Sequence, residues 1–196
     1  MTFLSAATLM FLVMDPLGNV PLFLSALGSV SPERQTRVVA RELILAYVIL
    51  VVFLFGGKYL LAMLHISGPA LTLAGGLVLF LIALRMVFPS RDGALYETIE
   101  GEPFIVPLAV PYVAGPSATA TVLLLMSREP ERWPHWLLAL TAAWAAAAAI
   151  LIMGSRLRRV LGRKGLIAVE RLMGMVLVAV AVQMFLEGLQ AARLIS

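Results

Sequence analysis

Six apolar runs, each about long enough to cross a lipid bilayer, constrain this 196-residue chain more than any other feature of its sequence. A transmembrane helix needs about 20 apolar residues to cross roughly 30 Å of hydrocarbon. A strand of a membrane barrel needs only about 10 residues of alternating polarity, and no such alternation is visible. The sequence therefore predicts an all-α polytopic membrane protein, one integral membrane domain over residues 1–196, with six transmembrane helices at residues 3–27, 43–64, 70–88, 103–126, 136–153 and 172–189.

Composition excludes several classes of protein. The chain is 61% hydrophobic and 13% charged, whereas about 25% of an average soluble domain is charged. Because it has no cysteine and only two histidines, a thiolate metal site, a cysteine nucleophile and a zinc enzyme are disfavoured. Its basic residues are dispersed between apolar runs, which is not typical of nucleic-acid binding. We therefore expect no enzyme, no metal, no cofactor and no nucleic-acid partner.

The basic residues of the predicted loops fall mainly on one side of the membrane. Short loops rich in Lys and Arg stay on the cytoplasmic side. The first, third and fifth loops together hold ten such residues: Arg34, Arg37, Arg41, Arg91, Arg156, Arg158, Arg159, Arg163, Lys164 and Arg171. The opposite side holds three: Arg128, Arg132 and Arg193. This asymmetry predicts that both termini lie outside.

The two halves of the chain resemble each other. Residues 76–86 and 174–184 each read glycine, eight apolar residues, one polar residue and methionine. Because a unit of three spans is odd in number, the second copy would enter the membrane from the opposite face, as in many secondary transporters. We therefore expect two inverted three-helix repeats, at about 1–90 and 103–190; the alternative is a chance likeness of two apolar helices.

Spans 1 and 4 are interrupted by proline and glycine near their middles, at residues 15–21 and 111–117. The helix-breaking residues are Pro16, Pro21, Pro111 and Pro116. Proline lacks an N–H and displaces the carbonyl four residues earlier, and irregular backbone at membrane depth is tolerated only inside protein or beside water. We expect both broken helices to face the bundle interior and to meet near the midplane. Half-helix N-termini there could bind an anionic group, and freed carbonyls a cation.

Asp15 is the acidic residue that the predicted spans place deepest, since the others fall in loops or at span ends. An ionised carboxylate at the bilayer centre costs about 2.5–3.5 kcal/mol on an insertion scale, so the group should be protonated, hydrated or paired. Two roles stay open, together or separately: a reversible proton carrier, or a cap for a half-helix that begins at the next residue.

Four further residues complete the predicted substrate or ion site around Asp15. They are Gly18, Asn19, Gly115 and Ser117. Asparagine and serine side chains can contact a polar solute, and they can also bond a nearby helical carbonyl, as polar side chains in membrane helices commonly do. No catalytic role is predicted for any of them.

Residues 15–23, 74–86 and 107–116 together resemble the MarC family of bacterial six-span membrane proteins, also known as UPF0056. The resemblance extends over nearly the whole chain. It implies a multi-pass protein of the bacterial inner membrane, with the outer face periplasmic, related to the LysE-type exporters of amino acids and other small solutes. It supplies no substrate.

The sequence favours a secondary transporter that exports a small polar, amino-acid-like solute, with proton coupling through Asp15. No nucleotide-binding signature is present. A non-transporting membrane scaffold is the alternative. An intramembrane enzyme is less favoured, because Asp15 lacks a second deep carboxylate and both His65 and His135 are predicted at loop depth. The expected partners are the lipid bilayer and a small polar solute, and a homo-oligomer is left open.

Overall fold

The computed structural model describes residues 1–63, 65–88 and 102–193, and this part of the chain is helical. Its elements are α1 (Phe3–Met14), α2 (Pro16–Ala26), α3 (Pro32–Met63), α4 (Gly68–Val87), the π-helix η1 (Leu108–Val113), α5 (Pro116–Arg128), the 3-10 helix η2 (Pro130–Arg132), α6 (Trp133–Ile152) and α7 (Gly154–Arg193). The described residues form no β-strand beyond one isolated bridge between Phe104 and Val106. The all-α prediction is confirmed.

Five described segments are long and apolar enough to cross a membrane. They are Phe3–Ala26, Pro32–Met63, Gly68–Val87, Pro130–Ile152 and Lys164–Ala192. The predicted span at residues 103–126 is not among them, because it is divided between η1 and α5. At 1.5 Å per residue the 13 residues of α5 extend only about 20 Å, less than the hydrocarbon core. The structure therefore supports a polytopic helical membrane protein, with five helices of spanning length where six were predicted.

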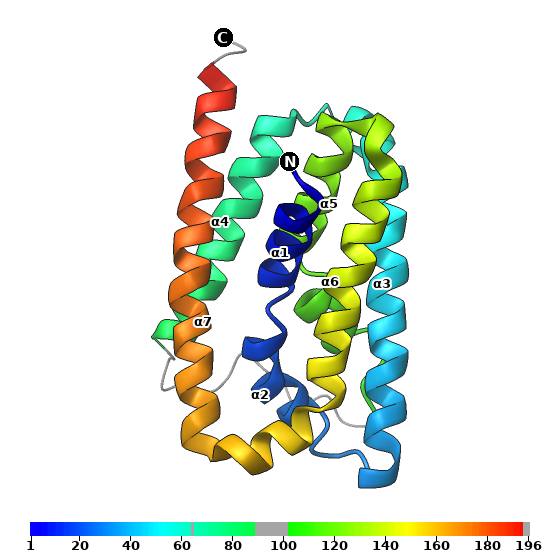
Figure 1. Ribbon diagram of the computed structural model, residues 1–196, viewed down its shortest axis with the longest axis vertical. Helices are drawn as coiled ribbons and strands as arrows, with labels where there is room; N and C mark the ends of the chain where they lie inside the picture. Colours follow the sequence, from blue (N-terminus) through cyan, green and yellow to red (C-terminus); the bar gives the residue numbers. More distant parts are fainter. Residues whose placement is uncertain (64, 89–101, 194–196) are drawn as a thin grey trace.

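The segment that holds η1 and α5 nevertheless connects the two ends of the bundle. α3 begins at the lower end of Figure 1, and Arg41 in its first part donates to Glu102 Oε1 at 2.8 Å and to the carbonyl of Pro103. At the upper end, the N-terminal amine of Met1 donates to Glu129 Oε1 at 3.2 Å. The chain between Pro103 and Glu129 thus extends from the end where α3 begins to the end where the chain begins.

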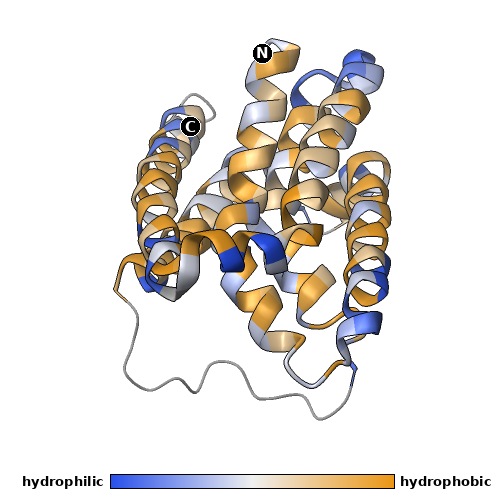
Figure 2. Ribbon diagram, turned by 60° about the horizontal axis from the view of Figure 1, so that its bottom comes forward, coloured by the Kyte–Doolittle hydropathy of each residue, from blue (hydrophilic) through white to orange (hydrophobic). Residues whose placement is uncertain are grey.

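Two helices extend beyond their predicted spans. α3 begins at Pro32 rather than near residue 43, and α7 begins at Gly154 rather than near residue 172. α7 bends at Gly162 (φ 64°, ψ 179°), so its first part lies across the lower end of the bundle (Figure 1). Hydrophilic residues gather at these helix ends, whereas the middles of the helices are hydrophobic (Figure 2). Hydropathy marks the part of a helix that lies in lipid, and helices continue past it.

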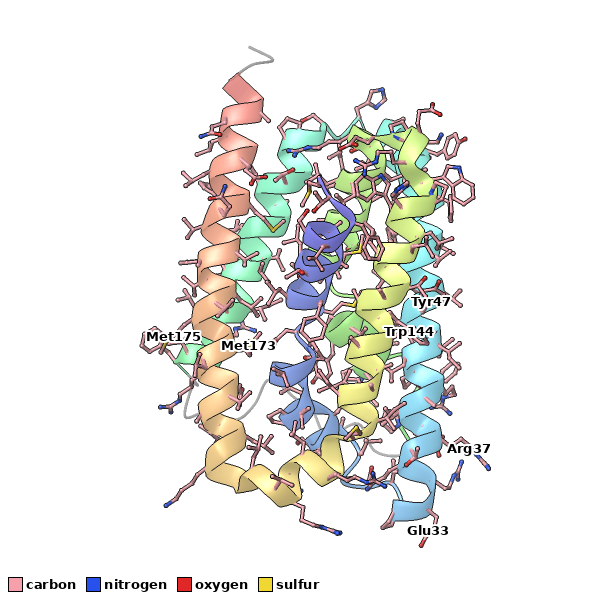
Figure 3. All side chains as sticks on the ribbon, viewed as in Figure 1. Glu33, Arg37, Tyr47, Trp144, Met173 and Met175 are labelled. Atoms are coloured by element: carbon pink, nitrogen blue, oxygen red, sulfur yellow. The ribbon has the colours of Figure 1, made fainter. Side chains whose placement is uncertain are left out.

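Aromatic side chains hold α3 against α6. The rings of Tyr47 and Trp144 are 4.9 Å apart between their centroids (Figure 3). Trp144 Nε1 donates to the Leu43 carbonyl at 2.8 Å, and the hydroxyls of Tyr47 and Thr141 are 2.8 Å apart. The polar atom of each aromatic side chain is thus satisfied within the bundle, as burial in lipid requires.

α4 and α7 form the most extensive helix pair, and glycine allows their backbones to approach. A Cβ atom added at Gly76 would lie 3.0 Å from the Ala181 carbonyl oxygen, and one added at Gly174 would lie 3.1 Å from the Ala83 carbonyl oxygen. The two glycines are 98 positions apart in the sequence, and so are the two alanines. The contact is therefore reciprocal.

Candidate functional site

The first helix interruption is a single residue, Asp15, between α1 and α2. Asp15 adopts a left-handed conformation (φ 42°, ψ 61°), which aspartate tolerates better than most residues. Its N–H donates to the carbonyls of Phe11 and Leu12, both at 3.1 Å, and its Oδ1 accepts the N–H of Gly18 at 3.1 Å. Pro16 follows at the first helical position, where a missing N–H costs nothing. Asp15 therefore ends one helix and caps the next.

The interruption is narrower than the predicted range 15–21. Pro21 lies inside α2, which continues to Ala26. The carbonyl of Leu12, expected to be freed by Pro16, accepts the N–H of Asp15. Most backbone groups at the break thus keep a hydrogen-bond partner, and the polar group that the break contributes is the carboxylate of Asp15.

The carboxylate of Asp15 is buried, with 7% of the residue exposed. A Cβ atom added at Gly18 would be 2.1 Å from Asp15 Oδ2 and 2.3 Å from Met86 Cε, so glycine makes room for both groups. The prediction that Asp15 lacks a second deep carboxylate as a partner stays a prediction.

The second interruption is made by backbone alone. Val110 inside η1 is extended (φ −128°, ψ 127°), and Pro111 follows it. Gly115 precedes α5 without any side-chain cap, and Pro116 is the first residue of α5. A Cβ atom at Gly115 would lie 2.5 Å from the Pro111 carbonyl oxygen. Glycine is required here because two stretches of backbone touch.

The amide of Asn19 joins the two interruptions. Its Nδ2 donates to the Met14 carbonyl at 2.8 Å and to the Tyr112 carbonyl at 2.9 Å, and only 7% of the residue is exposed. The rings of Phe23 and Tyr112 pack beside this contact, with centroids 6.3 Å apart. The structure thus brings the broken parts of spans 1 and 4 into direct contact.

Hydroxyl groups near the start of α5 bond mainly within that helix. Ser117 is buried and its carbonyl accepts the hydroxyl of Thr121 at 2.8 Å, while Thr119 Oγ1 donates to the Gly115 carbonyl at 3.0 Å. The two threonines thus satisfy helical carbonyls, as hydroxyls in membrane helices commonly do. Among the described residues, no group of three His, Cys, Asp or Glu side chains is placed to hold a metal ion.

One buried acid, Glu42, was not predicted from the sequence. It lies in α3, is 0% exposed, and its Oε1 accepts Arg41 Nε at 2.9 Å, whereas Oε2 has no hydrogen-bond partner within the described part of the chain. Arg41 and Arg34 both pair with Glu102 at 2.8 Å, which ties α3 to the start of the segment that leads to η1. Val38 and Ala46, four residues before and after Glu42, are also buried, so Glu42 lies on the face of α3 that packs into the bundle. No local sequence signal marks it as buried, because the neighbouring Arg41 gives the segment the hydropathy of a loop.

The fold and the paired interruptions define a class, multi-pass helical membrane proteins with broken helices. The sequence model described as MarC family integral membrane protein matches residues 1–193. The chain belongs to the MarC family, which confirms the resemblance noted from its motifs.

Related proteins are similar over nearly their whole length. The UPF0056 inner membrane protein YhgN of Escherichia coli strain K12 is 46% identical over 188 residues, covering 95% of each chain. A UPF0056 membrane protein of Buchnera aphidicola subsp. Schizaphis graminum is 41% identical over 188 residues, covering 96% of each. One from Pyrococcus abyssi is 30% identical over 187 residues, covering 93% of this chain and 92% of the relative. No solved structure matches. The name of the Escherichia coli relative agrees with a multi-pass inner-membrane location, and these names give no substrate.

Proposed function

We propose that this protein is a secondary transporter that exports a small polar, amino-acid-like solute, with protons coupled through Asp15. The observation that carries the proposal is the contact of the two interrupted helices through Asn19, beside the buried carboxylate of Asp15. Secondary transporters bind substrates and coupling ions where discontinuous helices meet near the midplane. In this proposal Gly18, Gly115 and Ser117 complete the lining of the site, and no residue is catalytic.

An inverted repeat is the second part of the proposal. Reciprocal contacts, in which residue i meets j and the equivalent of j meets the equivalent of i, are the property of a two-fold axis. The contacts of Gly76 with Ala181 and of Gly174 with Ala83 have this form. Because α4 and α7 run antiparallel, such an axis would lie in the membrane plane. We infer six membrane crossings in two three-helix repeats, at about 1–90 and 103–190, with η1 and α5 forming the fourth crossing.

The packing of the half-helices supports the same repeat. α2 packs against α7 and α6, and α5 packs against α4 and α3. In the proposed repeat α2 corresponds to α5, α6 to α3 and α7 to α4. Replacing each helix by its counterpart therefore converts the contacts of α2 into those of α5. Each broken span therefore packs against helices of the opposite repeat, which is the arrangement that rocking of one repeat against the other requires.

Asp15 is proposed to act as cap and carrier together. The ionised carboxylate accepts a charge-assisted hydrogen bond from the Gly18 N–H and lies at the positive end of the α2 dipole. Protonation removes the charge and weakens both interactions. The position of α2 would then depend on whether Asp15 carries a proton, which links proton binding to movement of the site.

Solute flux in proteoliposomes under an imposed pH gradient tests the function. A panel of radiolabelled amino acids is assayed with the wild type, Asp15→Asn and the matched control Glu33→Gln, an exposed acid at the lower end of α3 (Figure 3). The wild type and the control should show flux that follows the pH gradient, and Asp15→Asn should exchange solute without responding to it. Equal proton-driven flux in Asp15→Asn rejects the carrier role. Absence of flux in the wild type favours a scaffold.

Orientation is tested separately by C-terminal fusions. We propose that both termini are periplasmic, because the lower end carries most of the basic residues of the predicted loops, including Arg37 (Figure 3). An alkaline phosphatase fusion should be active and a green fluorescent protein fusion dark. The reverse result would contradict this orientation.

A further inference from the structure

A cavity of about 730 Å³ lies between α1, α5 and α7, near the end of the bundle where the chain begins. Ligand sites commonly enclose about 300–1,000 Å³ and are mainly apolar with a few placed polar groups. The cavity lies away from the Asn19 contact and from the carboxylate of Asp15, neither of which lines it.

Polarity is divided along the length of the cavity. Its deeper wall is apolar and includes Leu9, Leu125 and Val180. Its rim carries Arg128 at the end of α5 and Glu187 on α7, each seven residues beyond the deeper lining residue of its own helix, Thr121 or Val180. Seven residues of helix correspond to about 10 Å. The cavity is therefore apolar inside the membrane and charged at its surface.

The two rim charges lack counter-charges within the described residues. Arg128 forms no ion pair there, and the neighbouring Glu129 is already engaged by Arg132 at 2.7 Å and by the N-terminal amine at 3.2 Å. Glu187 accepts a hydrogen bond from Gln183 Nε2 at 3.0 Å, a neutral donor on its own helix. One wall thus presents a cation and the other an anion, above an apolar interior.

We propose that this cavity binds one zwitterionic phospholipid, with its phosphate on Arg128, its ammonium on Glu187 and an acyl chain along the apolar wall. Arginine binds phosphate with paired, charge-assisted hydrogen bonds, and a carboxylate pairs with an ammonium group. The combination of both charges selects a headgroup that also carries both. This inference rests on the membrane location of the chain and not on transport.

Native mass spectrometry of the full chain tests the proposal. The protein is released from nanodiscs that contain equal amounts of phosphatidylethanolamine and phosphatidylglycerol with identical acyl chains. The wild type should retain one phosphatidylethanolamine. Arg128→Gln should lower its retention roughly fivefold, the effect of about one charge at a membrane surface. Glu187→Gln should remove the preference over phosphatidylglycerol.

Two matched controls separate lipid binding from general damage. Arg37→Gln is the same change in an exposed arginine near the start of α3, at the opposite end of the bundle (Figure 3) and outside the cavity, and it should retain the lipid. Val180→Trp fills the cavity and should expel the lipid, whereas Val182→Trp, on an exposed surface of α7, should not. Tryptophan fluorescence checks that each variant is folded.

Three outcomes would overturn the proposal. Unchanged lipid retention in both Arg128→Gln and Val180→Trp would place any bound lipid elsewhere. A wild-type preference for phosphatidylglycerol would reject the role of Glu187. A lipid-free particle with the mass of two chains, split by Val180→Trp and not by Val182→Trp, would show that a second copy occupies the cavity.

Discussion

The two interrupted helices differ in the groups that stabilise the break in each. In the first, Asp15 alone leaves the helix, and its side chain caps the half-helix that follows. In the second, η1 is irregular over several residues, and Gly115 precedes α5 with no side-chain cap. A proline follows directly in both, at positions 16 and 116. The first break depends on a group that can gain or lose charge, and the second depends on backbone that cannot.

Of the two interruptions, only the first has a side chain, Asp15, that can bind and release a proton. The packing of α4 against α7 is reciprocal, so the two halves are alike where they touch. They are unlike at the interruptions, where only the first carries a carboxylate. An inverted repeat with one ionisable break would have one proton-sensitive half and one half that follows it.

The largest expected effect comes from removing the group that joins the two breaks. Asn19→Leu is nearly isosteric and deprives the Met14 and Tyr112 carbonyls of this donor in a buried site. Loss of a buried hydrogen-bond donor costs about 1–3 kcal/mol for each acceptor it served, so the free energy of unfolding should fall by about 2–6 kcal/mol. Thermal unfolding in detergent, followed by tryptophan fluorescence, measures it.

A matched control for Asn19 lies near the start of α3. Gln35 Nε2 also donates hydrogen bonds to two carbonyls, those of Leu27 at 3.2 Å and Val30 at 3.1 Å, and this site is partly exposed. Water can replace this donor, so Gln35→Leu should cost less than about 1 kcal/mol. If the two variants unfolded alike, the breaks would not depend on Asn19.

The second prediction contrasts the two glycines of the breaks. Gly115→Ala places its Cβ against the Pro111 carbonyl, which is backbone and cannot move aside, and should cost about 1–3 kcal/mol. Gly18→Ala meets the side chains of Asp15 and Met86, which can rotate away, and should cost less. Gly56→Ala, with no atom within 4 Å, should be neutral or stabilising. Thermal unfolding ranks them, and a larger cost at Gly18 would reverse the contrast between rigid and adaptable breaks.

The third prediction tests the likeness of the halves. Gly76→Ala and Gly174→Ala each push a Cβ against the carbonyl oxygen of an alanine on the opposite helix. Each should lower the free energy of unfolding by about 1–2 kcal/mol, and the two values should agree within roughly 0.5 kcal/mol. Two strongly unequal losses of stability, measured in the same detergent, would show that the two contacts are alike in geometry but differ in energy.

The smallest expected effect is on the pH dependence of thermal stability, and it concerns Glu129. The hydrogen bond from Arg132, with a contribution from the N-terminal amine, holds the pKa of Glu129 below its usual value. A carboxyl with a lowered pKa stabilises the fold above its unfolded pKa, and this stabilisation is lost as the pH falls through the lowered pKa. Glu129→Gln should therefore slightly reduce the loss of thermal stability in acid. An unchanged pH profile would assign that loss to carboxyls other than Glu129.

Much of the fold could be predicted from sequence because lipid demands apolar runs and because proline and glycine mark irregular backbone. The break at Asp15 and the irregular segment before Pro116 were both predicted on these grounds. The burial of Glu42 was not, because its neighbour Arg41 gives the segment the hydropathy of a loop. Hydropathy reports the solvent around a helix, whereas burial of a carboxylate depends on tertiary packing that a local window does not contain.

Pro21 shows a second limit of sequence patterns. Proline was expected to break the helix there, yet α2 continues for five residues beyond it. Pro21 is the sixth residue of α2, so its missing N–H removes one helical hydrogen bond, the one to the carbonyl of Leu17, and the helix continues without it. Whether a helix ends or continues at an internal proline depends on the packing around it, which the sequence does not contain.

The reciprocal contact between α4 and α7 has a consequence for biosynthesis. It can form only if α4 and α7 cross the bilayer in opposite directions, so the distribution of arginine and lysine among the loops, which sets the direction of a helix, is a condition for packing these two glycines. A substitution in a loop that inverted one half during insertion would abolish this contact without altering a single residue in it.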